Sequence, residues 1–198
     1  MTAVTLSPGT LIVLEGLDRT GKSTQSEALR DLLDPATTHH VHMPTGTTPF
    51  TTRVYSLLES ADEAPANRFA RQLAHLACHA ETVPQLQRLL RTGGVVLDRW
   101  WWSTFAYGWS TGDLPSAGIT EATFRNLIES VWDPVTASVV FLFDKPYKAD
   151  ARNTEPVAEG YRRLAANSTN TVIVPQADTG EITVRIIAEL RRRNLIME

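Results

Sequence analysis

One segment of eight residues has the composition and spacing of a phosphate-binding loop. Residues 16–23 read Gly-Leu-Asp-Arg-Thr-Gly-Lys-Ser and match G-x-x-x-x-G-K-[ST] at every fixed position. The glycines let backbone N–H groups turn toward phosphate oxygens, and the helix that follows points its positive end at the same anion. Lys22 is expected to reach the β- and γ-phosphates of ATP, and Ser23 is expected to bind Mg²⁺. The remaining expected cofactor-binding residues are Gly16, Asp18, Arg19, Thr20, Gly21 and Thr24.

A second group of charged residues follows another apolar run. Asp98 and Arg99 come directly after residues 95–97, and ligands collect at the carboxyl ends of strands in open α/β sheets. Asp98 could act through Mg²⁺ or on an acceptor group, and Arg99 suits a bidentate grip on phosphate. Arg19 could bridge the γ-phosphate and an acceptor phosphate. The alternatives that stay open are an Asp98–Arg99 ion pair with a structural role and a solvated surface arginine at position 19.

Aromatic and polar side chains could shape a nucleotide pocket. The aromatic cluster consists of Trp100, Trp101, Trp102, Phe105, Tyr107 and Trp109. Flat rings with polar tips can form a wall for a base, and rings in such number also build cores. On the predicted helix over residues 65–90, His75 and His79 share one face with Arg68 and Gln72. That face points either to the cleft or to water.

These residues need strands and helices that bring them to one place. Short apolar runs predict five strands, at residues 10–15, 38–43, 95–98, 138–144 and 171–174. Helical patterns predict helices at residues 22–33, 51–60, 65–90 with a kink at Pro84, 100–107, 120–132 and 181–193. Uniformly apolar strands that alternate with helices favour a parallel sheet covered on both faces. The sequence therefore predicts an α/β fold, a five-stranded parallel sheet flanked by helices, as a single domain over residues 1–198.

Composition narrows the classes of protein. The chain is 42% hydrophobic and 21% charged, as in ordinary globular proteins, and no stretch approaches the roughly 20 apolar residues that span a bilayer. Residues 1–9 lack a secretory signal, so we expect a cytoplasmic protein without membrane contact. Its single cysteine, Cys78, excludes an internal disulfide framework and a multi-cysteine zinc site. The net charge of −3 gives no footprint for long nucleic-acid contacts, which leaves nucleic acid to a local patch.

The motifs together resemble the thymidylate kinase family. Residues 14–25 read LEGLDRTGKSTQ and residues 96–100 read VLDRW. The resemblance covers about residues 10–110 well and the rest loosely. It implies a P-loop NTPase fold of the nucleotide kinase type and transfer of the ATP γ-phosphate to dTMP or a related pyrimidine nucleoside monophosphate. It also implies a homodimer that contacts its second copy through the helix around residues 66–90.

Carried over position by position, the resemblance implies a role for each of several residues. The catalytic residues would be Arg19, Lys22, Asp98, Arg99 and Arg152, with Ser23 and Asp98 at the metal. The substrate-binding residues would be Phe50, His75, His79, Arg99, Ser103 and Tyr107.

Four departures from the family pattern concern the acceptor side. Residues 42–47 read His-Met-Pro-Thr-Gly-Thr and lack the arginine expected near the acceptor phosphate. Cys78 and His79 stand where the family has Asn-Arg or Asp-Arg, and His75 stands where it usually has Phe. The lid is shortened to residues 145–155, where the available cations are Lys145, Lys148 and Arg152. Trp100 replaces a tyrosine.

Three functions stay open on the sequence alone. The first is a nucleotide kinase of the thymidylate kinase type. The second is a P-loop kinase that acts on a modified pyrimidine nucleotide, a nucleoside or a base within DNA. The third is a non-catalytic ATP-binding module. A guanine-nucleotide switch is disfavoured because the Asn-Lys-x-Asp and Asp-x-x-Gly segments are missing, and Arg19 with Arg99 supplies more positive charge than simple binding needs.

Overall fold

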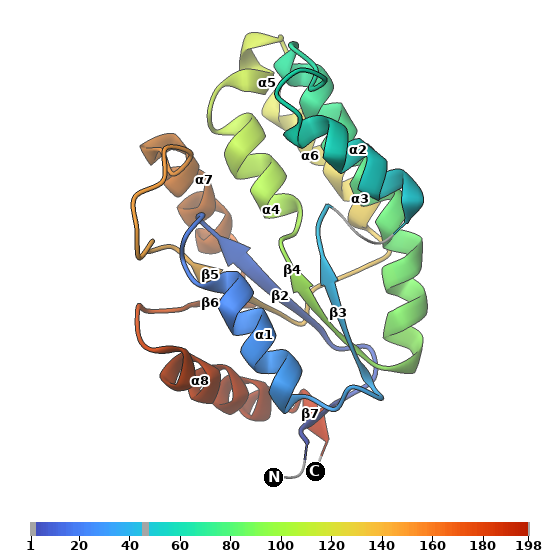
Figure 1. Ribbon diagram of the computed structural model, residues 1–198, viewed down its shortest axis with the longest axis vertical. Coiled ribbons are helices and arrows are strands. Elements are labelled where there is room, and N and C mark those ends of the chain that lie inside the picture. The colour runs from blue at the N-terminus through green and yellow to red at the C-terminus, as the bar shows by residue number, and fades with distance from the viewer. Residues whose placement is uncertain (1–2, 45–47, 198) are drawn as a thin grey trace.

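A five-stranded parallel sheet forms the centre of the molecule (Figure 1), whose computed structural model describes residues 3–44 and 48–197. The strands are β2 Leu11–Gly16, β3 Thr38–His42, β4 Gly94–Asp98, β5 Val139–Phe143 and β6 Thr171–Ile173, in the order β3-β4-β2-β5-β6. Every residue of β2, β4 and β5 is buried, as expected of strands covered on both faces. The predicted sheet is confirmed, and each strand begins and ends within one residue of its predicted bounds.

Helices cover both faces of the sheet and enclose two apolar clusters. On one face, α1 Lys22–Leu32 and α8 Thr179–Arg192 lie side by side (Figure 1) and pack Leu29 and Ile186 against Ile12 of β2. On the other face lie α3 Arg68–Thr92, α4 Trp101–Thr104, α6 Glu121–Trp132 and α7 Glu155–Ala166. Their side chains pack against Val13 and Leu97. The alternation of inward residues along each strand therefore feeds two separate cores.

Two helices and a helical turn pack on the helices of this second face. The helix α2 Pro49–Glu59 and the short helix α5 Asp113–Ser116 both pack on α3 (Figure 1). The end of α4 continues into a π-helical turn, η1 Phe105–Trp109. The expected kink site, Pro84, lies inside α3, which continues through it as one element.

Several elements have no counterpart in the prediction. The strands β1 Thr5–Leu6 and β7 Ile196–Met197 pair antiparallel and bring the two ends of the described chain together. Helix α7 follows the predicted lid directly, and α5 is a single turn. Within the described ranges, no helix is long and apolar enough to cross a bilayer.

Candidate active site

The glycine loop joins β2 to α1 at the carboxyl edge of the sheet. Gly16 ends β2 with φ +131, and Gly21 precedes α1 with φ +87. A Cβ atom on Gly16 would lie 2.0 Å from the backbone oxygen of Phe143. Because real Cβ atoms do not approach so closely, only glycine lets the loop leave the sheet at this point.

Lys22 lies inside this loop and is 5% exposed. Its Nζ donates hydrogen bonds to the carbonyl oxygen of Gly16 at 3.0 Å and to that of Leu17. Burial, together with the positive charge of Arg99, lowers the pKa of Lys22 to about 8. An ammonium group that is buried and held by loop carbonyls is placed to exchange them for phosphate oxygens.

Ser23 and Asp98 meet where the ends of β2 and β4 adjoin. Ser23 Oγ donates to Asp98 Oδ2 at 3.4 Å, and His42 Nδ1 lies 3.1 Å from the same oxygen. Asp98 Oδ1 is buried and has no hydrogen-bond partner among the described residues. Burial would raise the pKa of Asp98, but the hydrogen bond and charge of His42, with Arg99 and Lys22, hold it below its usual range. The pair thus offers a hydroxyl and a carboxylate oxygen to a cation.

These donors fit Mg²⁺ as a shared rather than a self-contained site. Mg²⁺ prefers oxygen ligands and usually binds through one or two protein groups plus phosphates and water. Among the described residues, no cluster of three or more His, Cys, Asp or Glu could hold a metal ion. Ser23 and the unpartnered Asp98 Oδ1 would therefore supply the protein ligands, and phosphate oxygens the others.

Arg99 lies between the end of β4 and the start of α4, and its side chain faces the glycine loop. Its backbone has φ +70, and its guanidinium group donates to Asp18 Oδ1 and, at 3.2 Å, to Ser103 Oγ. Asp18 lies within the glycine loop and is 8% exposed. The structure therefore brings Arg99, Asp18 and Lys22 together as predicted neighbours of the phosphates.

The predicted lid lies against the phosphate loop. Arg152 Nε lies 3.1 Å from Asp18 Oδ2, and Arg19 Nε lies 3.3 Å from Asp150 Oδ2. Asn153 makes two bonds with the Asp18 backbone, because Oδ1 accepts from the N–H at 2.8 Å and Nδ2 donates to the carbonyl at 2.7 Å. The two arginines of the loop and the lid are thus held by carboxylates at the place where phosphates are expected.

The structure does not bring His79 to the cleft. Its side chain is 3% exposed, its Nε2 lies 3.0 Å from Thr104 Oγ1, and its ring meets Trp132 edge-on at 5.5 Å. Trp100 in turn packs perpendicular to Trp132 at 5.8 Å. Burial lowers the pKa of His79 to about 3. The expected base contact at position 79 is replaced by a core contact, because the large indole rings fill the space beside α3.

The other expected substrate-binding residues lie on different elements. Phe50 is 47% exposed on α2. His75 is half-buried on α3, where burial is the largest influence on its pKa and lowers it. Tyr107 donates to Asn153 Oδ1 at 3.3 Å, next to the lid. Ser103 bonds to Arg99 and to other protein groups.

The remaining expected residues lie in the loop, at the start of α1 and around residues 42–47. Thr24 is exposed on the first turn of α1, and Thr20 Oγ1 donates to the Leu17 carbonyl at 2.8 Å. Residues 45–47, part of the segment that lacks the family's arginine, lie outside the described residues. His42, from the same segment, is described and touches Asp98.

Sequence reasoning missed several polar residues at the site. Glu15 is fully buried beside the loop, and Tyr161 Oη donates to its Oε2 at 3.1 Å. Tyr55 of α2 lies near Arg99 and Arg152, and burial and Glu59 raise its pKa. A carboxylate at the end of an apolar strand was the one available signal. The tyrosines carried no local pattern.

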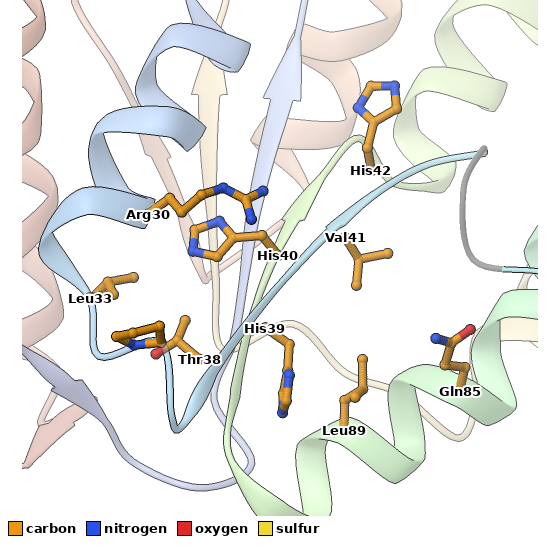
Figure 2. Close-up of a pocket in the computed structure, with 10 residues that line it drawn as sticks. Arg30, Leu33, Thr38, His39, His40, Val41, His42, Gln85 and Leu89 are labelled. Carbon is orange, nitrogen blue, oxygen red and sulfur yellow. The ribbon is translucent and has the colours of Figure 1, made fainter.

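A cavity of about 600 Å³ lies along the outer edge of β3 (Figure 2). His40 and Arg30 lie on its α1 side, and His39 and Leu89 lie on its α3 side. Among the described residues that line it, none belongs to the glycine loop, and His42 also lies 3.1 Å from Asp98 Oδ2. We place the candidate site at the loop, because the cations and the metal-type donors converge there.

The fold and the loop define a P-loop NTPase. Comparison with known families agrees, because the thymidylate kinase family model matches residues 14–156. The chain belongs to the thymidylate kinase family, which is a family of nucleotide kinases.

Solved structures support the fold. The thymidylate kinase of Candida albicans matches with a TM-score of 0.71 and 21% identity over 100% of this chain and 97% of that one. The thymidylate kinase of Ehrlichia chaffeensis matches with a TM-score of 0.73 and 22% identity over 93% of this chain and 100% of that one. The comparison with curated proteins finds no match.

Proposed function

We propose that this chain uses Mg²⁺ and ATP to phosphorylate dTMP or a related pyrimidine nucleoside monophosphate. The observation that carries the proposal is the convergence of Lys22, Arg99 and Arg152 around Asp18, at the carboxyl edge of the sheet. A site with so many cations suits a transition state in which charge spreads over the phosphate oxygens.

The donor half follows from the loop. Backbone N–H groups at the start of α1 and the ammonium group of Lys22 would bind the β- and γ-phosphates. Ser23 and Asp98 would hold Mg²⁺, which when bound neutralises charge on the phosphate oxygens. Arg19 and Arg152 would leave Asp150 and Asp18 and turn to phosphate, since both side chains are mostly exposed and free to move.

The acceptor half supplies the second reactant. A phosphate oxygen of the acceptor attacks the γ-phosphorus, the bond to the β,γ-bridging oxygen breaks, and the products are ADP and a nucleoside diphosphate. Arg99 stands between the loop and the acceptor side, where it would hold the acceptor phosphate in line. Its planar fork can bind two oxygens at once.

A second candidate concerns the acceptor. His79 is buried against Trp132, and Trp100 packs on the same indole. This arrangement favours an acceptor whose base is read differently from dTMP: a modified pyrimidine nucleotide, a nucleoside or a base within DNA. A non-catalytic ATP-binding module is the third possibility carried from the sequence.

The test is ADP release from MgATP with a panel of acceptors. The panel contains dTMP, dUMP, other monophosphates, modified pyrimidine nucleotides, thymidine and DNA, and the control is Lys22→Ala. Turnover with dTMP that Lys22→Ala abolishes supports the proposal. Turnover only with another acceptor supports the second candidate, and binding of ATP with no turnover on any acceptor supports the binding module.

A further inference from the structure

Glu15 is a fully buried carboxylate that no step of the proposed transfer uses. It lies on β2 directly before the loop and is 0% exposed. Its Oε1 accepts from the backbone N–H groups of Trp100 at 2.7 Å and Ser103 at 3.0 Å. Its Oε2 accepts from the N–H of Gly16 at 3.1 Å, from Ser103 Oγ at 2.8 Å and from Tyr161 Oη at 3.1 Å.

The donors come from three different parts of the site. Gly16 belongs to the phosphate loop, Trp100 and Ser103 to the start of α4, and Tyr161 to α7, which follows the lid. One carboxylate thus joins the donor loop, the arginine-bearing segment and the lid helix. A buried charge is costly unless hydrogen-bonded, so a fully bonded one fixes the relative position of these elements.

The network ends on Arg99. Ser103 Oγ accepts from Arg99 at 3.2 Å and donates to Glu15 Oε2. The opposite charges of Glu15 and Arg99 also attract each other: Arg99 lowers the pKa of Glu15, and Glu15 raises the pKa of Arg99. Because three backbone N–H groups need acceptors at this carboxyl group, we treat it as the carboxylate, although burial raises the pKa of Glu15.

We propose that Glu15 is a positioning residue that acts through Ser103 to hold Arg99 against the phosphate loop. Ser103 then serves Arg99 and does not contact the nucleotide. The inference rests on the proposed phosphotransfer, in which Arg99 binds the acceptor phosphate. A displacement of about 1 Å in such a group can slow transfer about 100-fold.

The variant Glu15→Gln tests the role with little change in shape. Its amide oxygen can accept from Trp100 and Ser103, and its amide nitrogen can donate to the hydroxyl oxygens of Ser103 and Tyr161. The N–H of Gly16 and the two hydroxyl hydrogens lose their acceptor, and one hydroxyl can donate to the other across 2.9 Å. The matched control is Glu189→Gln on α8, where a carboxylate accepts from Arg192 and Arg193 away from the site.

Steady-state kinetics with MgATP and the best acceptor give the first readout. We expect Glu15→Gln to lower kcat about 10- to 100-fold with little change in the KM for ATP, and Glu189→Gln to match the wild type. In an Arg99→Lys background, Glu15→Gln should lower kcat by no more than about twofold, because coupled residues are not additive. The same loss in both backgrounds, or an unchanged kcat, would overturn the inference.

A second readout needs no turnover. The order parameter of the Arg99 side-chain Nε–H bond, measured by NMR and assigned through the signal lost in Arg99→Lys, reports whether the guanidinium is held. We expect it to fall in Glu15→Gln and to stay unchanged in Glu189→Gln. An equally rigid Arg99 in Glu15→Gln would overturn the inference. A silent wild type with the expected NMR result would contradict the proposed function alone.

Discussion

At the scale of single residues, the loop is constrained most strongly at its first glycine. Gly16 combines a φ of +131 with a backbone oxygen 2.0 Å from where a Cβ atom would be. Gly118 also has a positive φ, +78, but a Cβ atom there would have no other atom within 4 Å. The two positions therefore separate the cost of backbone strain from the cost of a steric clash.

We expect Gly16→Ala to lower the free energy of unfolding by roughly 2–6 kcal/mol, since strain and overpacking add. Gly118→Ala should cost about 1 kcal/mol, from strain alone. Urea unfolding followed by circular dichroism measures both. Equal losses at the two positions would show that contact with Phe143 is not what requires glycine at position 16.

Asp98 carries the expected metal contact at the same scale. We expect Asp98→Asn to lower kcat about 100-fold and to raise the Mg²⁺ concentration needed for half-maximal rate, because a carboxylate ligand is lost. His42→Ala serves as the comparison, since it removes a neighbour of Asp98 and leaves the carboxylate. Turnover titrated with MgCl₂ after treatment with EDTA gives the measurement. An unchanged Mg²⁺ requirement in Asp98→Asn would exclude the carboxylate as a ligand.

At the scale of elements, the packing of α3 on α4 and α6 depends on a neutral histidine. His79 is buried between Thr104 and Trp132. Its pKa in the folded protein is lowered to about 3 from the ordinary value of 6.5. Between these values the unfolded chain binds a proton that the folded chain does not, so stability falls as the pH drops below about 6.5.

We therefore expect the wild type to lose roughly 1–2 kcal/mol more than His79→Gln when the pH is lowered from 7.5 to 5. Each protein is compared with itself at the two pH values, and the difference between the two proteins then cancels the effect of groups that both contain. One such group is His40, because burial and the charge of Arg30 lower its pKa to about 4. Urea midpoints at both pH values provide the data. Parallel losses in the two proteins would mean that His79 does not titrate as its burial requires.

The sequence predicted elements where the local pattern was strong. Every residue of β2, β4 and β5 is buried, which requires the continuous apolar runs that the sequence shows at these positions. Helix α7 begins Glu-Pro after a polar lid and gave no apolar run at its start. The strands β1 and β7 have two residues each and pair with one another from distant parts of the sequence, which no local pattern reveals.

Prediction of the site was limited in the same way. The loop residues follow a fixed spacing, and the structure places Lys22, Ser23 and Asp98 together. Glu15 and Tyr161 are 146 positions apart, and no local spacing reveals that they touch. His79 went to the core because Trp132, from a segment without a motif, packs against it. Long-range packing decided what local pattern could not.

At the scale of the whole molecule, the arrangement of α2, α3 and α6 leaves apolar side chains at the surface. Leu73 and Leu127, which line one shallow hollow, are 44% and 42% exposed, and Leu57 of α2 is 45% exposed. We propose that the homodimer implied by the family resemblance forms around Leu73 and Leu127. The mass measured by light scattering should be twice that of the 21.9 kDa chain, and Leu73→Glu should return it to a monomer. A monomeric wild type would contradict this prediction.

Transfer of the label from [γ-³²P]ATP to dTMP measures the proposed phosphotransfer itself. Wild-type protein and Lys22→Ala are each incubated with Mg²⁺, labelled ATP and dTMP, and the nucleotides are separated. We expect labelled dTDP with the wild type and at least about 100-fold less of it with Lys22→Ala. Release of labelled phosphate without a labelled nucleotide, or equal labelling by both proteins, would contradict the proposed phosphotransfer.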